Sequence, residues 1–170
     1  MNWQADDHAA LFRFCERLEH VSWIAAVNNW VVSSVLIELA HYFGFFLLVG
    51  TIAAVDLRVL GIIGRRDTDD QLGKQLFPLM WTGLALAILS GFVMFAGQAT
   101  LYYPNPVFRA KLLVIAFAIS FGVVVQANLP KWNRMPSVSN GARLIALVSL
   151  LLWVAAILAA VEIPHLTYVP

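Results

Sequence analysis

Residues 31–55 read VVSSVLIELAHYFGFFLLVGTIAAV, an apolar run of 25 residues that contains one glutamate and one histidine. A helix needs about 20 apolar residues to cross the hydrocarbon core of a bilayer. Three further runs of similar character follow, at about residues 76–97, 107–127 and 143–163. Since a helix satisfies its own backbone hydrogen bonds in lipid, each run predicts a membrane-spanning helix. The sequence therefore predicts an all-α integral membrane protein, a four-helix bundle.

The composition of the whole chain agrees with this prediction. Of its 170 residues, 61% are hydrophobic and 12% are charged, whereas a typical soluble domain is about 25% charged. The formal net charge of +1 argues against a role in binding nucleic acid. The single cysteine, Cys15, excludes an intrachain disulfide and a cysteine-based metal or iron–sulfur site.

The first 29 residues are expected to lie on the membrane surface. Between residues 9 and 25, apolar side chains recur at three- and four-residue steps, which predicts an amphipathic interfacial helix. Trp23 and Trp30 are the expected headgroup anchors. The segment lacks a basic start and a small-residue cleavage site, so we do not expect a cleavable signal peptide. The chain thus divides into an interfacial segment, 1–29, and a four-helix membrane domain, 30–170.

The distribution of lysine and arginine predicts the orientation. Seven of these residues lie beside the connections that follow the first and third spans, against four on the other side. Because such residues accumulate on the cytoplasmic side, both termini are expected outside. The sequence predicts a multi-pass protein of the bacterial inner membrane, N-out and C-out, with its outer face in the periplasm.

Close packing between the spans is expected to come from small residues, because apolar helices have no hydrophobic drive to associate in lipid. Gly83, Ala87 and Gly91 form a stripe of small residues on the second span. This stripe favours a compact bundle.

Glu38 and His41 are polar residues inside the first span. Being three residues apart, they share one face of the helix, and His41 would lie roughly 15 Å deep, near the midplane. An ionisable side chain at that depth needs a partner or a function. Lys111, near the outer end of the third span, is the expected ion-pair partner of Glu38. Asp56 and Arg143, at the inner edge, predict a second ion pair.

A b-type haem is the cofactor that these residues favour, and His41 is the predicted ligand of the haem iron. Such a haem takes an imidazole from one helix and usually a second axial ligand from another. Gly44 would let the flat macrocycle approach the helix backbone. His165 is the candidate second ligand, but a straight fourth helix places it near the outer surface. Only a fold-back at Pro164 would bring the two imidazoles together.

Other interpretations of these residues compete with haem. E-x-x-H occurs twice, ending at His41 and His165, but a di-iron centre also needs a carboxylate from each of the other two helices. The second and third spans contain none. A neutral His41 that bonds to Glu38, to a backbone carbonyl or to a polar group such as Ser90, and a proton relay, stay open.

The residues able to support chemistry gather in the outer third of the bundle. They are Glu38, Tyr102, Tyr103, Arg109, Lys111, Glu162 and His165. A site at that end, supported by Glu38 and Lys111, would suit exchange of electrons or of a quinone with a periplasmic partner.

The chain resembles a family of small bacterial four-span membrane proteins of unknown function. The similar stretches are ELAHYFGFFLLVGTIAAVDLRVLG (38–61), FPLMWTGLALAILSGFVMFAGQATLYYPNPVFRAKLL (77–113) and RLIALVSLLLW (143–153). They carry the patterns E-x-x-H, D-L-R-x-L-G and N-P-x-F-x-x-K. The resemblance implies the four-span architecture and points to Glu38, His41, Asp56, Arg58, Gly61, Asn105, Phe108 and Lys111.

We therefore expect a small inner-membrane redox or electron-transfer accessory protein that holds one b-type haem or a quinone near the periplasmic side. The alternative is a non-catalytic accessory or structural subunit of a larger membrane complex. An ion or metal carrier is a weaker third interpretation, because no span is visibly broken at the midplane. The expected partners are the lipid bilayer and either another membrane protein or a second copy of the chain. Whether the protein is an enzyme stays open.

Overall fold

The computed structural model describes residues 3–63, 71–135 and 137–167, and of residues 3–8, 71–74 and 161–167 the backbone alone. Over these ranges the chain is helical and contains no strand. The helices are α1 (Trp3–Glu19), α2 (Ser22–Asn29), α3 (Val31–Leu60), α4 (Gln71–Ala96), α5 (Ala99–Tyr102), α6 (Pro106–Asn133) and α7 (Asn140–Thr167).

Four of these helices are long and apolar enough to cross a membrane: Val31–Leu60, Gln75–Ala96, Pro106–Asn133 and Asn140–Ala160. The predicted all-α class and four-helix membrane bundle are thereby confirmed. α3 ends at Gly61, whose φ of 82° lies in the left-handed region that glycine adopts without steric cost.

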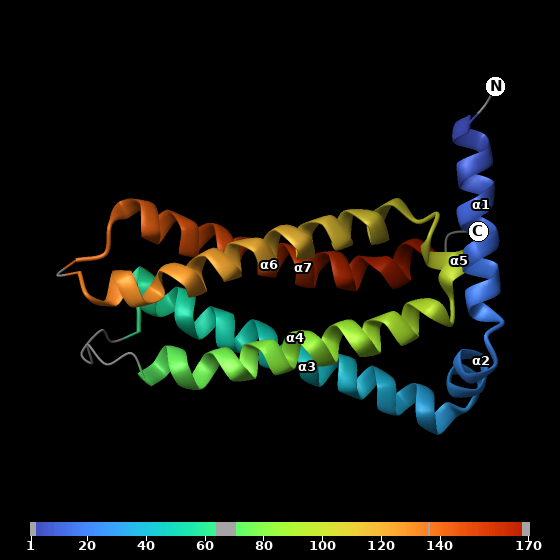
Figure 1. Ribbon diagram of the computed structural model, residues 1–170, viewed down its shortest axis with the longest axis horizontal. Helices are drawn as coiled ribbons and strands as arrows, with labels where there is room; N and C mark the ends of the chain where they lie inside the picture. Colours follow the sequence, from blue (N-terminus) through green and yellow to red (C-terminus); the bar gives the residue numbers. More distant parts are fainter. Residues whose placement is uncertain (1–2, 64–70, 136, 168–170) are drawn as a thin grey trace.

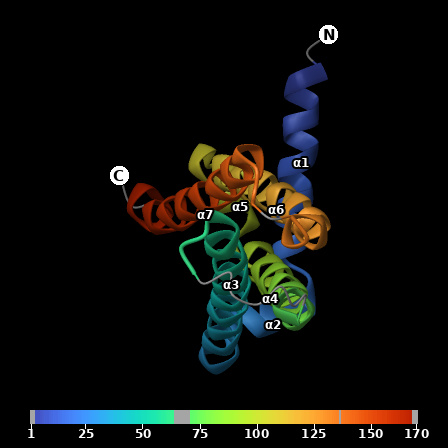
Figure 2. The same cartoon turned by 90° about the vertical axis from the view of Figure 1, so that its left-hand side faces the viewer.

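The long helices form two hairpins, α3 with α4 and α6 with α7 (Figure 1). α3 also packs against α7 and so joins the hairpins, whereas α4 and α6 touch at few points. Figure 2 shows the hairpins end-on. α1 lies across one end of the bundle, which we call the α1 end (Figure 1). α3 and α6 finish, and α7 begins, at the opposite end.

The backbones of α3 and α4 approach each other at two glycines. A Cβ atom on Gly44 would lie 2.8 Å from the backbone nitrogen of Ala87 and 2.9 Å from the carbonyl oxygen of Gly83. A Cβ on Gly83 would lie 2.7 Å from the backbone nitrogen of Leu48. The small-residue stripe expected on the second span is therefore where α3 packs. The face of Gly44 that was expected to receive a haem is covered by α4.

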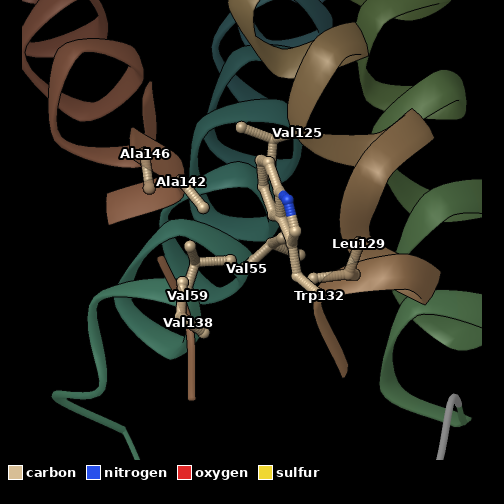
Figure 3. Packing of buried hydrophobic residues seen from close by; sticks show 8 residues of the cluster. All are labelled: Val55, Val59, Val125, Leu129, Trp132, Val138, Ala142 and Ala146. Carbon is tan, nitrogen blue, oxygen red and sulfur yellow. The ribbon is translucent and has the colours of Figure 1, made fainter. Parts of the chain in front are cut away.

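Two clusters of buried apolar side chains join α3, α6 and α7. The first lies near the opposite end, where Trp132 of α6 lies among side chains of α3 and α7 (Figure 3). The second lies farther toward the α1 end and includes Trp153 of α7. The ring of Trp153 meets Phe45 of α3 edge-on, with 6.2 Å between the ring centroids. Van der Waals packing of this kind is what holds helices together in lipid.

The expected interfacial helix is two helices, α1 and α2, which meet at His20 and Val21. Trp23 and Trp30 are exposed over 52% and 69% of their surface. Their rings are free to lie in a headgroup layer, as aromatic anchors do.

Polar contacts tie α1 and α2 to the α1 end of the bundle. The Glu19 carboxylate accepts two hydrogen bonds of 2.7 Å from Thr100, one from its backbone nitrogen and one from its hydroxyl. Asn28 of α2 lies against Gly97, where a Cβ atom would overlap the Asn28 side chain. Cys15 of α1 is buried, with 4% of its surface exposed. The N-terminal segment is thus docked on the bundle.

Cys15 provides a test of this docking. Burial, and secondarily the nearby Glu19 carboxylate, raise the pKa of its thiol, so little reactive thiolate is present. Glu19→Ala removes hydrogen bonds to a charged acceptor, worth about 1.5–3 kcal/mol. We expect N-ethylmaleimide to label Cys15 about tenfold faster in this variant. Glu16→Ala, at an exposed position of the same helix, is the matched control, and equal rates for Glu19→Ala and wild type would contradict the docking.

Candidate functional site

His41 of α3 points toward α4 and is half-buried there. Its Nδ1 atom lies 3.0 Å from the carbonyl oxygen of Ala87 and 3.2 Å from the hydroxyl oxygen of Ser90. A Cβ atom on Gly91 would lie 2.9 Å from Cε1 of the imidazole. The last glycine of the small-residue stripe thus leaves space for the His41 ring against the backbone of α4.

These contacts determine which ring nitrogen carries the proton. The Ser90 hydroxyl donates its hydrogen to the carbonyl oxygen of Leu86 at 2.6 Å, so toward His41 it can only accept. The Ala87 carbonyl is also an acceptor. Nδ1 of His41 must therefore be the donor, and in the neutral imidazole Nε2 then holds the lone pair. A bond from His41 to Ser90 or to a carbonyl was among the interpretations that the sequence left open.

Glu38 and Lys111 do not form the expected ion pair. The Glu38 carboxylate accepts a hydrogen bond of 3.0 Å from the hydroxyl of Tyr42, one turn along the exposed surface of α3. Among the described residues it has no ionic partner, because α3 packs chiefly against α4 and α7 rather than against α6, which carries Lys111. Lys111 itself is half-buried and close enough to His41 to act on it electrostatically.

The side chain of His165 lies outside the described residues. The backbone of α7 is helical from Asn140 to Thr167, so the chain does not fold back at Pro164. His20, on α1, has its Nδ1 atom 2.8 Å from the carbonyl oxygen of Glu16. Among the side chains that the structure describes, no second histidine lies beside His41, and no group of three or more His, Cys, Asp or Glu could hold a metal ion.

Asp56 is a second polar centre in the bundle. Its side chain is 0% exposed, and within the described ranges neither carboxylate oxygen has a hydrogen-bond partner. The expected ion pair with Arg143 is not formed, because Asp56 faces the interior from α3 whereas Arg143 is exposed at the start of α7. The hydroxyl group of Ser149 on α7 interacts electrostatically with the Asp56 carboxyl group, although the geometry does not form a hydrogen bond between them.

Two buried polar atoms of α7 share this property. In the described part of the chain, the Ser149 hydroxyl oxygen and Nε1 of Trp153 have no hydrogen-bond partner. A small cleft between α3, α4 and α6 reaches Asp56 and has room for about one water molecule. Its other polar side chains are Thr51 and Gln126. Unpartnered polar groups are rare in a folded interior and call for an explanation.

The sequence contained a signal for the burial of Asp56 that depth alone did not reveal. Gly44, Leu48, Ile52 and Asp56 follow one another at four-residue steps, and all four are buried. Residues at this spacing lie on one side of a helix. Each four-residue step turns about 40° around the helix, so the row leads from Gly44, which faces α4, round to Asp56 near α7 and stays inside the bundle.

Comparison with known proteins gives no relative for this chain. No protein-family model matches it, and neither a curated protein nor a solved structure does. The resemblance to a family of small four-span bacterial proteins stays a prediction. The geometry around His41 and Asp56 is therefore what bears on function.

The protonation of His41 can be measured directly. In ¹⁵N NMR spectra of histidine-labelled protein, with His41 assigned by its loss in His41→Gln, we expect the Nδ1-protonated neutral form. Gly91→Ala places a Cβ 2.9 Å from Cε1 and should displace the ring and abolish that signature. Among the described residues no atom lies within 4 Å of a Cβ on Gly50, so Gly50→Ala should leave the spectrum unchanged. A proton on Nε2 in the wild type would contradict the assignment.

Proposed function

We propose that the protein is a small redox accessory protein of the bacterial inner membrane that binds a quinone head group at His41. The α1 end would then face the periplasm. The observation that carries the proposal is the anchored imidazole, in which Nδ1 is held by Ala87 and Ser90 and Nε2 keeps its lone pair.

A histidine held in this way is suited to binding a ligand through its other ring nitrogen. Ligating and catalytic histidines commonly donate one ring N–H to a carbonyl oxygen, which fixes the ring and leaves the other nitrogen to act. Nε2 of His41 can accept a hydrogen bond from the hydroxyl group of a quinol. When a partner redox protein withdraws the two electrons of that quinol, Nε2 can receive one of the two protons released, and the other passes to water.

The surroundings of His41 support a quinone over a haem. α4 covers the face of Gly44 where a macrocycle would lie. In the oxidised form the quinone carbonyl needs a hydrogen-bond donor, which would be the ammonium group of Lys111, a group that acts electrostatically on His41; Nε2 of His41 would bind the hydroxyl of the reduced form.

The position of the site also suits a ligand that dissolves in lipid. Tyr42 and Phe43, which follow His41 on α3, are exposed over 49% and 64% of their surface. In a bilayer these side chains face acyl chains, so a quinone can approach His41 from the membrane. The exposed pair of Glu38 and Tyr42 adds a polar edge beside this approach.

The test is quinone binding by the full-length protein in mild detergent. We expect quinone to co-purify, and a short-chain quinol to bind about tenfold more weakly to His41→Ala, because the hydrogen bond of about 1.4 kcal/mol from the quinol hydroxyl to Nε2 is lost. His20→Ala removes a histidine from α1 and should bind as the wild type does. Equal binding by His41→Ala would overturn the assignment of the site.

Two other outcomes would replace the proposal. An absorption spectrum with a Soret band that disappears in His41→Ala would show that His41 holds haem rather than quinone. A well-folded, colourless protein that binds no quinone and co-purifies with a larger complex would favour the non-catalytic accessory subunit.

A further inference from the structure

Three buried polar groups of the bundle interior have no role in the quinone proposal. They are the carboxylate of Asp56 on α3, the hydroxyl of Ser149 and the indole N–H of Trp153 on α7, and in the described residues none has a hydrogen-bond partner. Asp56 and Ser149 are each 0% exposed. The Asp56 carboxyl group is fully enclosed beside the Ser149 hydroxyl. One hydrogen shared between the two would give both groups a hydrogen-bond partner.

We propose that Asp56 is a proton-binding site, which holds a proton in the folded protein and exchanges it through the cleft between α3, α4 and α6. A carboxylate anion without a partner is costly in an apolar interior, whereas the neutral acid is tolerated far better. The carboxyl O–H of the neutral acid can donate to the hydroxyl oxygen of Ser149 after a small rotation. An ionisable residue within a membrane span is a candidate functional site by default.

No cation takes the place of this proton among the residues that the structure describes. The side chains that line the cleft with Asp56 are uncharged, namely Thr51, Ile52, Val55, Leu76, Phe77, Met80, Val125 and Gln126. On α7, the residue that interacts with Asp56 is the uncharged Ser149, whereas the cationic Arg143 lies exposed at the start of the helix. Arg58, two residues along α3, does not donate to the Asp56 carboxylate. Among the groups that the structure describes, protonation is therefore the way to remove the charge.

The cleft provides the exchange route. It touches Asp56 and has room for about one water molecule. The hydroxyl hydrogen of Thr51 is directed to backbone carbonyls of its own helix, so its oxygen is left as an acceptor toward such a water. In the release step the carboxyl O–H bond breaks, the electron pair stays on Asp56, and the water accepts the proton and carries it out as hydronium.

This site is independent of the quinone site. Asp56 lies fifteen residues after His41 on α3, which corresponds to about 22 Å along the helix. Loss of quinone binding would leave the inference about Asp56 intact, and a charged Asp56 would leave the inference about His41 intact.

Infrared spectroscopy of the full-length protein in lipid nanodiscs tests the inference. We expect a carbonyl stretching band of a protonated carboxyl group at neutral pH, which shifts on selective ¹³C labelling of aspartate. The band should be lost in Asp56→Asn and retained in Glu16→Gln, which changes an exposed carboxyl group on α1. Absence of the band from the folded wild type, or its persistence in Asp56→Asn, would overturn the proposal.

Stability against pH gives a second measurement that needs no spectral assignment. If the folded protein holds a proton that the unfolded chain releases more readily, stability must fall as the pH rises through the point of release. Asp56→Asn mimics the neutral acid, so its unfolding midpoint should not show this fall. If Asp56→Asn does not fold, the labelled wild-type band still decides. A wild type whose stability rises over the same range would refute a bound proton.

Discussion

The contact between the backbones of α3 and α4 at Gly44 and Gly83 sets the orientation of α3, and the interior of the bundle depends on it. In lipid, apolar side chains gain nothing by leaving the solvent, so helices associate where small residues let their backbones touch. Once Gly44 faces α4, His41 lies one turn away beside the same helix. Leu48, Ile52, Val55 and Asp56 continue that inward face to the opposite end. α7 packs on it and joins the two hairpins.

The same orientation decides what happens to the polar groups. His41 meets carbonyl and hydroxyl acceptors on α4, which hold its Nδ1 proton and leave Nε2 for a ligand. Asp56 meets the apolar side chains of α4 and α6 and the hydroxyl of Ser149 on α7. The His41 imidazole is therefore hydrogen-bonded by its neighbours, whereas the Asp56 carboxyl group needs a proton. Glu38 lies off this face, where its carboxylate accepts a hydrogen bond from the hydroxyl of Tyr42.

The number of spans could be predicted from sequence, because the length and apolar character of a run are local properties. The partners of the polar residues could not. Depth in the membrane predicted one ion pair between Glu38 and Lys111 and another between Asp56 and Arg143. The actual partners depend on which helix faces pack together. Lipid-facing and protein-facing apolar residues look alike in a sequence. The small-residue stripe of the second span was the informative pattern, since it marks where α3 lies and where the His41 ring fits.

The most direct test of this account is the stability of three glycine variants in mild detergent. Gly44→Ala and Gly83→Ala each place a methyl group within 3 Å of the other helix's backbone, and we expect each to lower the free energy of unfolding by about 1–3 kcal/mol. Gly50→Ala, on the same α3 but with no described atom within 4 Å of its Cβ, should be neutral or stabilising by up to about 1 kcal/mol. Equal stability of all three variants would contradict the account, because the backbones of α3 and α4 could not then be in contact at Gly44 and Gly83.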